Sequence, residues 1–192
     1  PFIITLAILQ AIALTLLYSS LENNVWPATS PTWLVSLITF SMSFPLLMLM
    51  TVNKNNIKTS LLLILPFSLL LSLLGAYAGF QQEPQEYVSN SNLISVFIFT
   101  SLIAGFKGLM YIQQFGSSEN VSYSRLFKLS WRNFIIFGEC WLFVLIFWGI
   151  LNLGAALFDI LDIKFFSELL RDEWFWIPTL TLAFAFASII FR

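Results

Sequence analysis

The chain has 192 residues, of which 58% are hydrophobic and only 10% are charged, and its formal net charge is -1. Because about a quarter of the residues in a soluble domain are charged, this composition excludes an ordinary water-soluble fold. The lack of net basic charge argues against a nucleic-acid partner. The absence of histidine and the presence of one cysteine exclude intrachain disulfides, His/Cys zinc sites and histidine-based triads.

Six apolar stretches predict six membrane-spanning helices. A hydrocarbon core of about 30 Å needs about 20 helical residues, and every stretch except the last reaches that length easily. The alternation typical of a β-barrel is absent, so the predicted fold class is all-α, a polytopic transmembrane helical bundle. The stretches are Phe2–Leu21, Trp33–Val52, Thr59–Phe80, Leu93–Phe115, Phe134–Phe158 and Trp174–Phe191.

No repeat or soluble domain is visible, so residues 1–192 are predicted to form a single transmembrane helical module. The chain opens on a proline and stops directly after an apolar run. We therefore interpret it as a piece of a longer membrane protein that has further domains.

The loops between these stretches predict how the chain is oriented. Loops 22–32 and 81–92 contain no lysine or arginine, whereas loop 53–58 contains two and loop 116–133 contains three. Loop 159–173 holds two basic residues among five carboxylates. Because basic residues favour the cytoplasmic side, we expect the second and fourth loops, and both ends of the chain, to be cytoplasmic.

The fourth loop has the pattern of an amphipathic helix. At about 100° per residue, Arg125, Lys128 and Arg132 fall within about 60° of one another. The side chains on the opposite side are Tyr123, Leu126, Phe127, Trp131 and Phe134. The pattern predicts an interfacial helix that binds anionic lipid at the inner leaflet before the chain turns into the fifth span. Ordinary positive-inside anchoring and a regulated docking site are both compatible with it.

The fifth loop is also amphipathic and predicts a second interfacial helix. Its apolar residues Ile163, Phe166, Leu169 and Leu170 can face the membrane while the acidic residues face water. Asp159 and Asp162 lie one turn apart, but two exposed carboxylates supply too few oxygen ligands for a divalent cation. No metal site is predicted.

Two charged residues lie inside predicted spans. Lys107 and Glu139 lie about seven and six residues from the inner ends of the fourth and fifth spans, or about 9–11 Å deep. Their opposite charges at matched depth on consecutive spans predict a buried pair. Neighbouring small residues would allow close helix approach. These are Ala104, Gly105, Gly108 and Gly138.

The first interpretation of this pair is a small-solute or proton pathway, in which Glu139 binds the proton or cation and Lys107 is its counter-charge. The alternative is a structural or anchoring domain, in which the pair is a buried ion pair or Lys107 extends to the headgroups. Arg132 is a competing partner for Glu139. A lipid-modifying enzyme is the least favoured hypothesis, because no catalytic residues and no cofactor site are recognisable.

Small residues spaced four apart indicate close helix packing elsewhere in the chain. They are Gly75–Gly79, Ala104–Gly108 and Ala183–Ala187.

Several longer stretches resemble a known family. They are ENNVWPATSPTWL, LLGAYAGF, FKGLMYIQQF, RLFKLSWRNF, FWGIL and DEWFWIPTLTLAFAFASIIFR. In these stretches the chain resembles the N-terminal membrane region of the bacterial inner-membrane family "domain of unknown function 4153". The resemblance implies a Gram-negative inner-membrane location and members with further spans or a C-terminal part. It supplies no catalytic residues.

Overall fold

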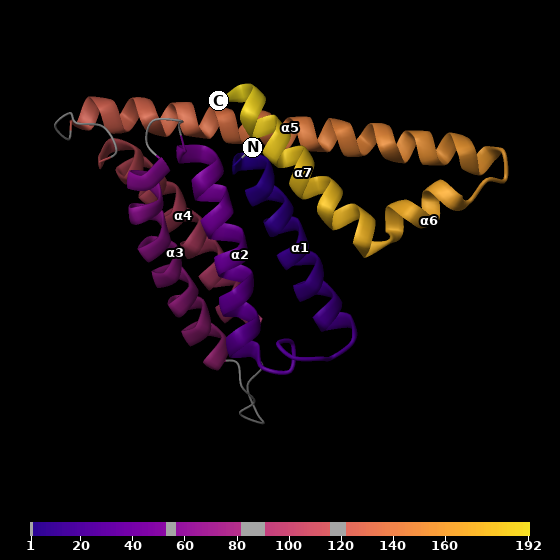
Figure 1. Cartoon of the computed structure of the whole chain (residues 1–192), viewed down its shortest axis with the longest axis horizontal. Helices are drawn as coiled ribbons and strands as arrows, with labels where there is room; N and C mark the ends of the chain where they lie inside the picture. Colours follow the sequence, from indigo (N-terminus) through magenta and orange to yellow (C-terminus); the bar gives the residue numbers. More distant parts are fainter. Residues whose placement is uncertain (1, 53–56, 82–90, 116–121) are drawn as a thin grey trace. The chain divides into compact units, whose positions relative to one another are not determined.

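A computed structural model describes residues 2–52, 57–81, 91–115 and 122–192. This part of the chain is mostly α-helical and contains no strand (Figure 1). Its helices are α1 (Phe2–Glu22), α2 (Pro31–Thr51), α3 (Ile57–Phe80), α4 (Ser91–Phe115), α5 (Tyr123–Ile160), α6 (Phe165–Arg171) and α7 (Glu173–Phe191). All except α6 are long and apolar enough to cross a membrane. The all-α prediction with six spans is therefore confirmed.

Helix α5 differs from the sequence prediction at its start. It has 38 residues and begins at Tyr123, so the helix predicted for the fourth loop and the fifth span form one continuous helix rather than two joined by a turn. No glycine or proline interrupts it before Gly138. At 1.5 Å per residue α5 is about 57 Å long, nearly twice the thickness of a hydrocarbon core. The helix predicted for the fifth loop is confirmed as α6.

The chain divides into two compact units. Unit 1 consists of Pro1–Ser19 and Phe134–Arg192, and unit 2 consists of Ser20–Asn133. Unit 2 therefore contains α2, α3, α4 and the first part of α5, whereas most of α1 and all of α6 and α7 belong to unit 1. That residues 1–192 act as a single module stays a prediction.

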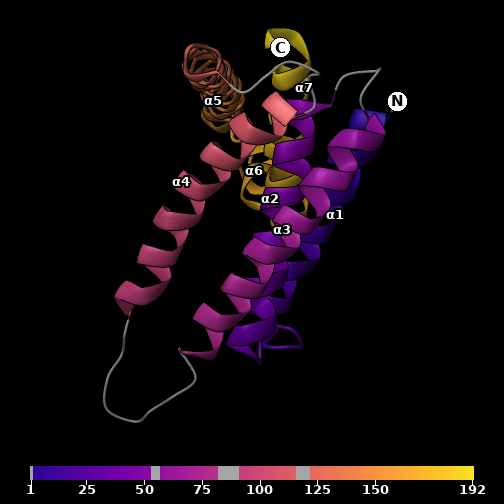
Figure 2. The same cartoon turned by 90° about the vertical axis from the view of Figure 1, so that its left-hand side faces the viewer.

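In unit 2, α2 and α3 run side by side in opposite directions (Figures 1 and 2). They approach closely because α3 presents small residues to α2. A Cβ atom added to Gly79 would lie 2.5 Å from the carbonyl oxygen of Pro31, and one added to Gly75 would lie 2.8 Å from Oγ1 of Thr39. The packing role predicted for Gly75 and Gly79 is confirmed. Helix α4 packs closely on α3 at Gly108, where an added Cβ atom would clash with the ring of Phe67.

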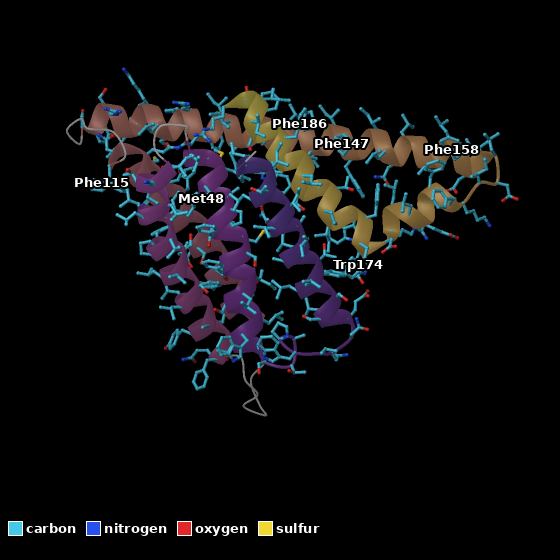
Figure 3. All side chains as sticks on the ribbon, in the orientation of Figure 1. Met48, Phe115, Phe147, Phe158, Trp174 and Phe186 are labelled. Carbon is cyan, nitrogen blue, oxygen red and sulfur yellow. The ribbon has the colours of Figure 1, made fainter. Side chains whose placement is uncertain are left out.

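The best-buried side chains of unit 2 include residues from the last turns of α2 and α4. Met48, labelled in Figure 3, is fully buried, and Gln114 of α4 is fully buried as well. Leu47, Leu49 and Met50 are also among the buried residues of α2. This end of the unit is the one predicted to face the cytoplasm, and it supports the start of α5.

In unit 1, aromatic rings mediate the contacts between helices. The ring of Phe184 on α7 lies with its centroid 6.0 Å from those of both Phe137 and Trp141 on α5. Tyr18 of α1 meets Trp176 of α7 edge to face at 5.8 Å. Rings of this size keep the backbones of α5 and α7 apart, and edge-to-face pairs at 4.5–7 Å are favourable geometries. Aromatic side chains of α5 therefore contribute to its contact with α7, although Trp141 itself is 46% exposed.

Candidate functional site

The first part of α5 lies beside the ends of α2 and α4, on the side away from α3 (Figures 1 and 2). Asn133, which is 2% exposed, holds residues 123–133 of α5 against α4. If α2 and α4 cross a membrane, residues 123–133 lie at the level of one of its surfaces, which is where interfacial amphipathic helices bind.

Three polar groups form a clamp at this crossing, and we call them the amide clamp: Gln113 of α4, Asn133 of α5 and the carbonyl of Met50 in α2. Asn133 Nδ2 donates to Gln113 Oε1 at 2.8 Å, and Gln113 Nε2 donates to Asn133 Oδ1 at 3.2 Å. Gln113 Nε2 also donates to the carbonyl oxygen of Met50 at 3.0 Å. Because α2 ends at Thr51, this carbonyl belongs to the last turn, whose carbonyls have no intrahelical partner. The clamp thus joins three helices at one point.

An aromatic stripe runs along one side of the clamped segment. Tyr123 is 84% exposed, and Phe127 and Trp131 are each 54% exposed. They are spaced four residues apart, so they lie on one helix face. The rings of Phe127 and Trp131 meet edge to face at 6.3 Å. A row of exposed aromatic side chains beside membrane-spanning helices is suited to the boundary between headgroups and acyl chains.

The three basic residues predicted to contact lipid are not equivalent in the structure. Lys128 and Arg132 are exposed and lie one turn apart; we call these two residues the basic edge. Arg125 is half-buried, with one guanidinium nitrogen inside the protein, and it already interacts with other residues of the chain. Of these three basic residues, Lys128 and Arg132 are therefore the two that are exposed to a ligand.

The two intramembrane charges lie on different units. Lys107 is exposed on α4 in unit 2, and Glu139 is exposed on α5 in unit 1, next to the fully buried Cys140. Each charge thus faces away from the core of its own unit. The prediction that they pair stays a prediction.

The small residues next to these charges behave differently from one another. Gly108 is in close contact with Phe67, as expected for a packing position. A Cβ atom added to Gly105 or Gly138 would have no neighbour within 4 Å. Gly105 and Gly138 therefore do not bring a neighbouring helix close to either charge in the structure described.

The pairing of Gln113 with Asn133 was not predicted from the sequence. Each lies near the end of a predicted span, where an amide ordinarily contacts water or headgroups, and they are twenty residues apart. The only available signal was that both amides lie on helix faces that carry apolar residues. Their partners follow from the crossing of α4 and α5, which no local pattern encodes.

No protein-family model matches this chain, and no significant similarity connects it to a curated protein or to a solved structure. The resemblance to the family "domain of unknown function 4153" accordingly stays a prediction. The fold itself defines the class: an all-α, multi-pass membrane protein with six apolar helices long enough to span a bilayer.

Proposed function

We propose that the chain is an anchoring module of a bacterial inner-membrane protein that binds anionic lipid at the inner leaflet through the basic edge of α5. One observation carries the proposal: the first part of α5 lies beside the ends of α2 and α4 with its aromatic stripe and its basic edge both exposed. Aromatic rings favour the interfacial zone, and each basic residue near an anionic surface contributes about 1 kcal/mol.

The amide clamp supports a lipid-binding role because it holds this segment in place before lipid binds. Gln113 and Asn133 make two reciprocal hydrogen bonds, so the segment is ordered without any contribution from lipid. A preorganised binding surface avoids part of the entropic cost of association. The positive-inside distribution of basic residues predicts that this end of unit 2 faces the cytoplasm, where anionic lipids contribute to the surface potential.

Neutralising the basic edge tests the proposal. In nanodiscs containing phosphatidylglycerol, the variant Lys128→Gln/Arg132→Gln is expected to bind anionic lipid with an affinity about thirtyfold lower, because two contributions of about 1 kcal/mol are lost. Native mass spectrometry after mild delipidation measures the lipid that remains bound. The matched control, Lys164→Gln/Arg171→Gln, removes the same charge from the fifth loop and should leave retention unchanged. Equal losses in both variants would show that only net charge matters and would refute a site on α5.

A second candidate function is the proton or small-solute pathway that involves Glu139 and Lys107. The observation that favours it is the position of Glu139, an intramembrane carboxylate that is exposed while the adjacent Cys140 is fully buried. A carboxylate in an apolar span that faces away from its own core is expensive in lipid. Water at that position would lower the cost and would give a proton or cation access to the carboxylate.

Thiol labelling tests whether water reaches this position. In a Cys140→Ser background, Glu139→Cys is expected to react with a charged thiol reagent added from the cytoplasmic side. A water-filled path admits the reagent and allows the thiol to lose its proton and form the reactive thiolate. Leu145→Cys, which replaces another exposed residue of the same helix, should stay unreactive in lipid. If neither cysteine reacts in a folded, monodisperse sample, the pathway is excluded and the anchoring function remains.

A further inference from the structure

The packed helices α2 and α3 carry hydroxyl side chains along their length. We call these residues the hydroxyl seam: Ser36, Ser43 and Thr51 on α2, and Ser60, Ser68 and Ser72 on α3. On α3 the seam follows the stripe that contacts α2, because Ser72 bonds Ser36 and Gly79 touches the start of α2. Ser68 lies one turn from Ser72 on this stripe. The side chains of Ser60, Ser68 and Ser72 are buried in unit 2, and so are the hydroxyl oxygens of Ser43 and Thr51.

The hydroxyl groups at one end of the seam satisfy each other. Ser36 Oγ and Ser72 Oγ are 2.8 Å apart, and Ser72 Oγ also donates to the carbonyl oxygen of Ser36 at 3.1 Å. Further along, the hydroxyl oxygens of Ser43, Ser68 and Thr51 are buried and have no hydrogen-bond partner among the described residues. Ser68 is 0% exposed. Leaving a buried hydroxyl unsatisfied is unfavourable, because the group has lost its bonds to water, so such groups normally have a partner.

A hydroxyl group on a helix can bond to a carbonyl in its own preceding turn, and other residues of this chain do so. Thr39 Oγ1 donates to the carbonyl oxygen of Val35 at 2.7 Å, and Ser188 Oγ donates to that of Ala185 at 2.7 Å. Ser43 and Ser68 make no such bond. Their hydroxyl oxygens are nevertheless buried, and the remaining common partner for a buried polar group is water.

The spacing along the two helices suits bridging water molecules. Measured from the level of Ser36 and Ser72 at 1.5 Å per residue, Ser68 lies about 6 Å and Ser43 about 10.5 Å further along the seam. Ser60 and Thr51 follow at about 18 Å and 22.5 Å. Successive hydroxyl groups are thus about 4–8 Å apart along the axis, a distance that one or two hydrogen-bonded water molecules span.

We propose that the hydroxyl seam binds a file of internal water molecules between α2 and α3, held by Ser43, Ser68 and Thr51. These waters complete the hydrogen bonding of the helix pair within the bilayer without any charged side chain. The file would end beside the amide clamp, because Thr51 directly follows Met50. This inference does not depend on the lipid-binding function proposed above.

Radiolytic footprinting tests the proposal, because radicals generated from a bound water oxidise side chains next to it even when bulk water does not reach them. In nanodiscs, Leu47 and Leu71 are expected to oxidise severalfold faster than Val144. Leu47 and Leu71 lie within about one turn of Ser43 and Ser68, and all three readout residues are similarly buried, at 4%, 3% and 5% exposed. In the variant Ser43→Ala/Ser68→Ala, both leucines should slow to the rate of Val144. Rates that match Val144 in the native protein, or that persist in the variant, would overturn the proposal.

A second variant covers the case in which the double substitution disturbs folding. Thr51→Val keeps the shape of the side chain and removes only the hydroxyl group, so it is expected to slow oxidation of the adjacent Met50, which is 5% exposed, and to leave Val144 unchanged. An unchanged rate at Met50 in folded Thr51→Val protein would mean that no water is held at this end of the seam, and the continuous file would be refuted.

Discussion

Replacing Gly79 with alanine is expected to destabilise unit 2 by about 1–3 kcal/mol, a typical cost of overpacking. The added Cβ atom would lie 2.5 Å from the carbonyl oxygen of Pro31 and 2.7 Å from the Cα atom of Thr32. Both neighbours are backbone atoms, so no side-chain rotation relieves the clash, and α2 and α3 must separate. A gain in helix propensity of up to about 1 kcal/mol from the same substitution does not offset this cost. Thermal or denaturant unfolding in detergent measures the change.

The matched control is the same substitution at Gly105, where a Cβ atom would have no neighbour within 4 Å. Gly105→Ala is expected to leave stability unchanged or to raise it slightly, because only the propensity term remains. Gly75→Ala should fall between the two, since its closest neighbour is the side-chain oxygen of Thr39, which can rotate. If Gly79→Ala and Gly105→Ala unfolded at the same point, the close approach of α2 and α3 at Gly79 would be contradicted.

The spans were predictable because length and hydropathy determine them almost completely in a bilayer. In Phe2–Leu21 and Leu93–Phe115, for example, apolar residues continue for about 20 positions, and a helix is the structure that satisfies every backbone group there. The start of the fifth span was less predictable, because the residues before Phe134, such as Arg132, are polar and yet helical. The chain therefore stays helical from Tyr123 onward, although its apolar stretch begins only at Phe134.

The contacts between helices were predictable only where one residue type imposes them. Glycines four apart, such as Gly75 and Gly79, indicate close approach because they leave room for a neighbouring backbone. An amide or a hydroxyl gives no comparable signal, because it can bond to water, lipid, its own helix or a neighbour. The pairing of Gln113 with Asn133 and the burial of Ser68 depend on where helices cross, and this follows from the packing of the whole unit.

Replacing Gln113 with leucine is expected to release the first part of α5 from unit 2 and to cost about 1–3 kcal/mol, the penalty for leaving buried polar partners unsatisfied. The substitution leaves both the carbonyl of Met50 and the amide of Asn133 without Gln113 as their partner. Asn133→Leu should cost less, because Gln113 keeps its bond to Met50. The double variant should cost less than the sum of the single variants, with a coupling energy of about 0.5–3 kcal/mol. Unfolding measurements on the four proteins give this energy.

Two further measurements link the amide clamp to the proposed lipid site. Hydrogen exchange of the backbone amides in residues 124–133 is expected to accelerate in Gln113→Leu, and retention of anionic lipid should fall even though Lys128 and Arg132 are intact. The matched control is Gln81→Leu, which removes only an exposed hydrogen bond to the hydroxyl of Tyr77 and should change stability by less than about 0.5 kcal/mol. If Gln113→Leu behaved like Gln81→Leu, the clamp would not position α5. If exchange accelerated but lipid retention stayed the same, the segment would be clamped as described and the anionic lipid would bind elsewhere.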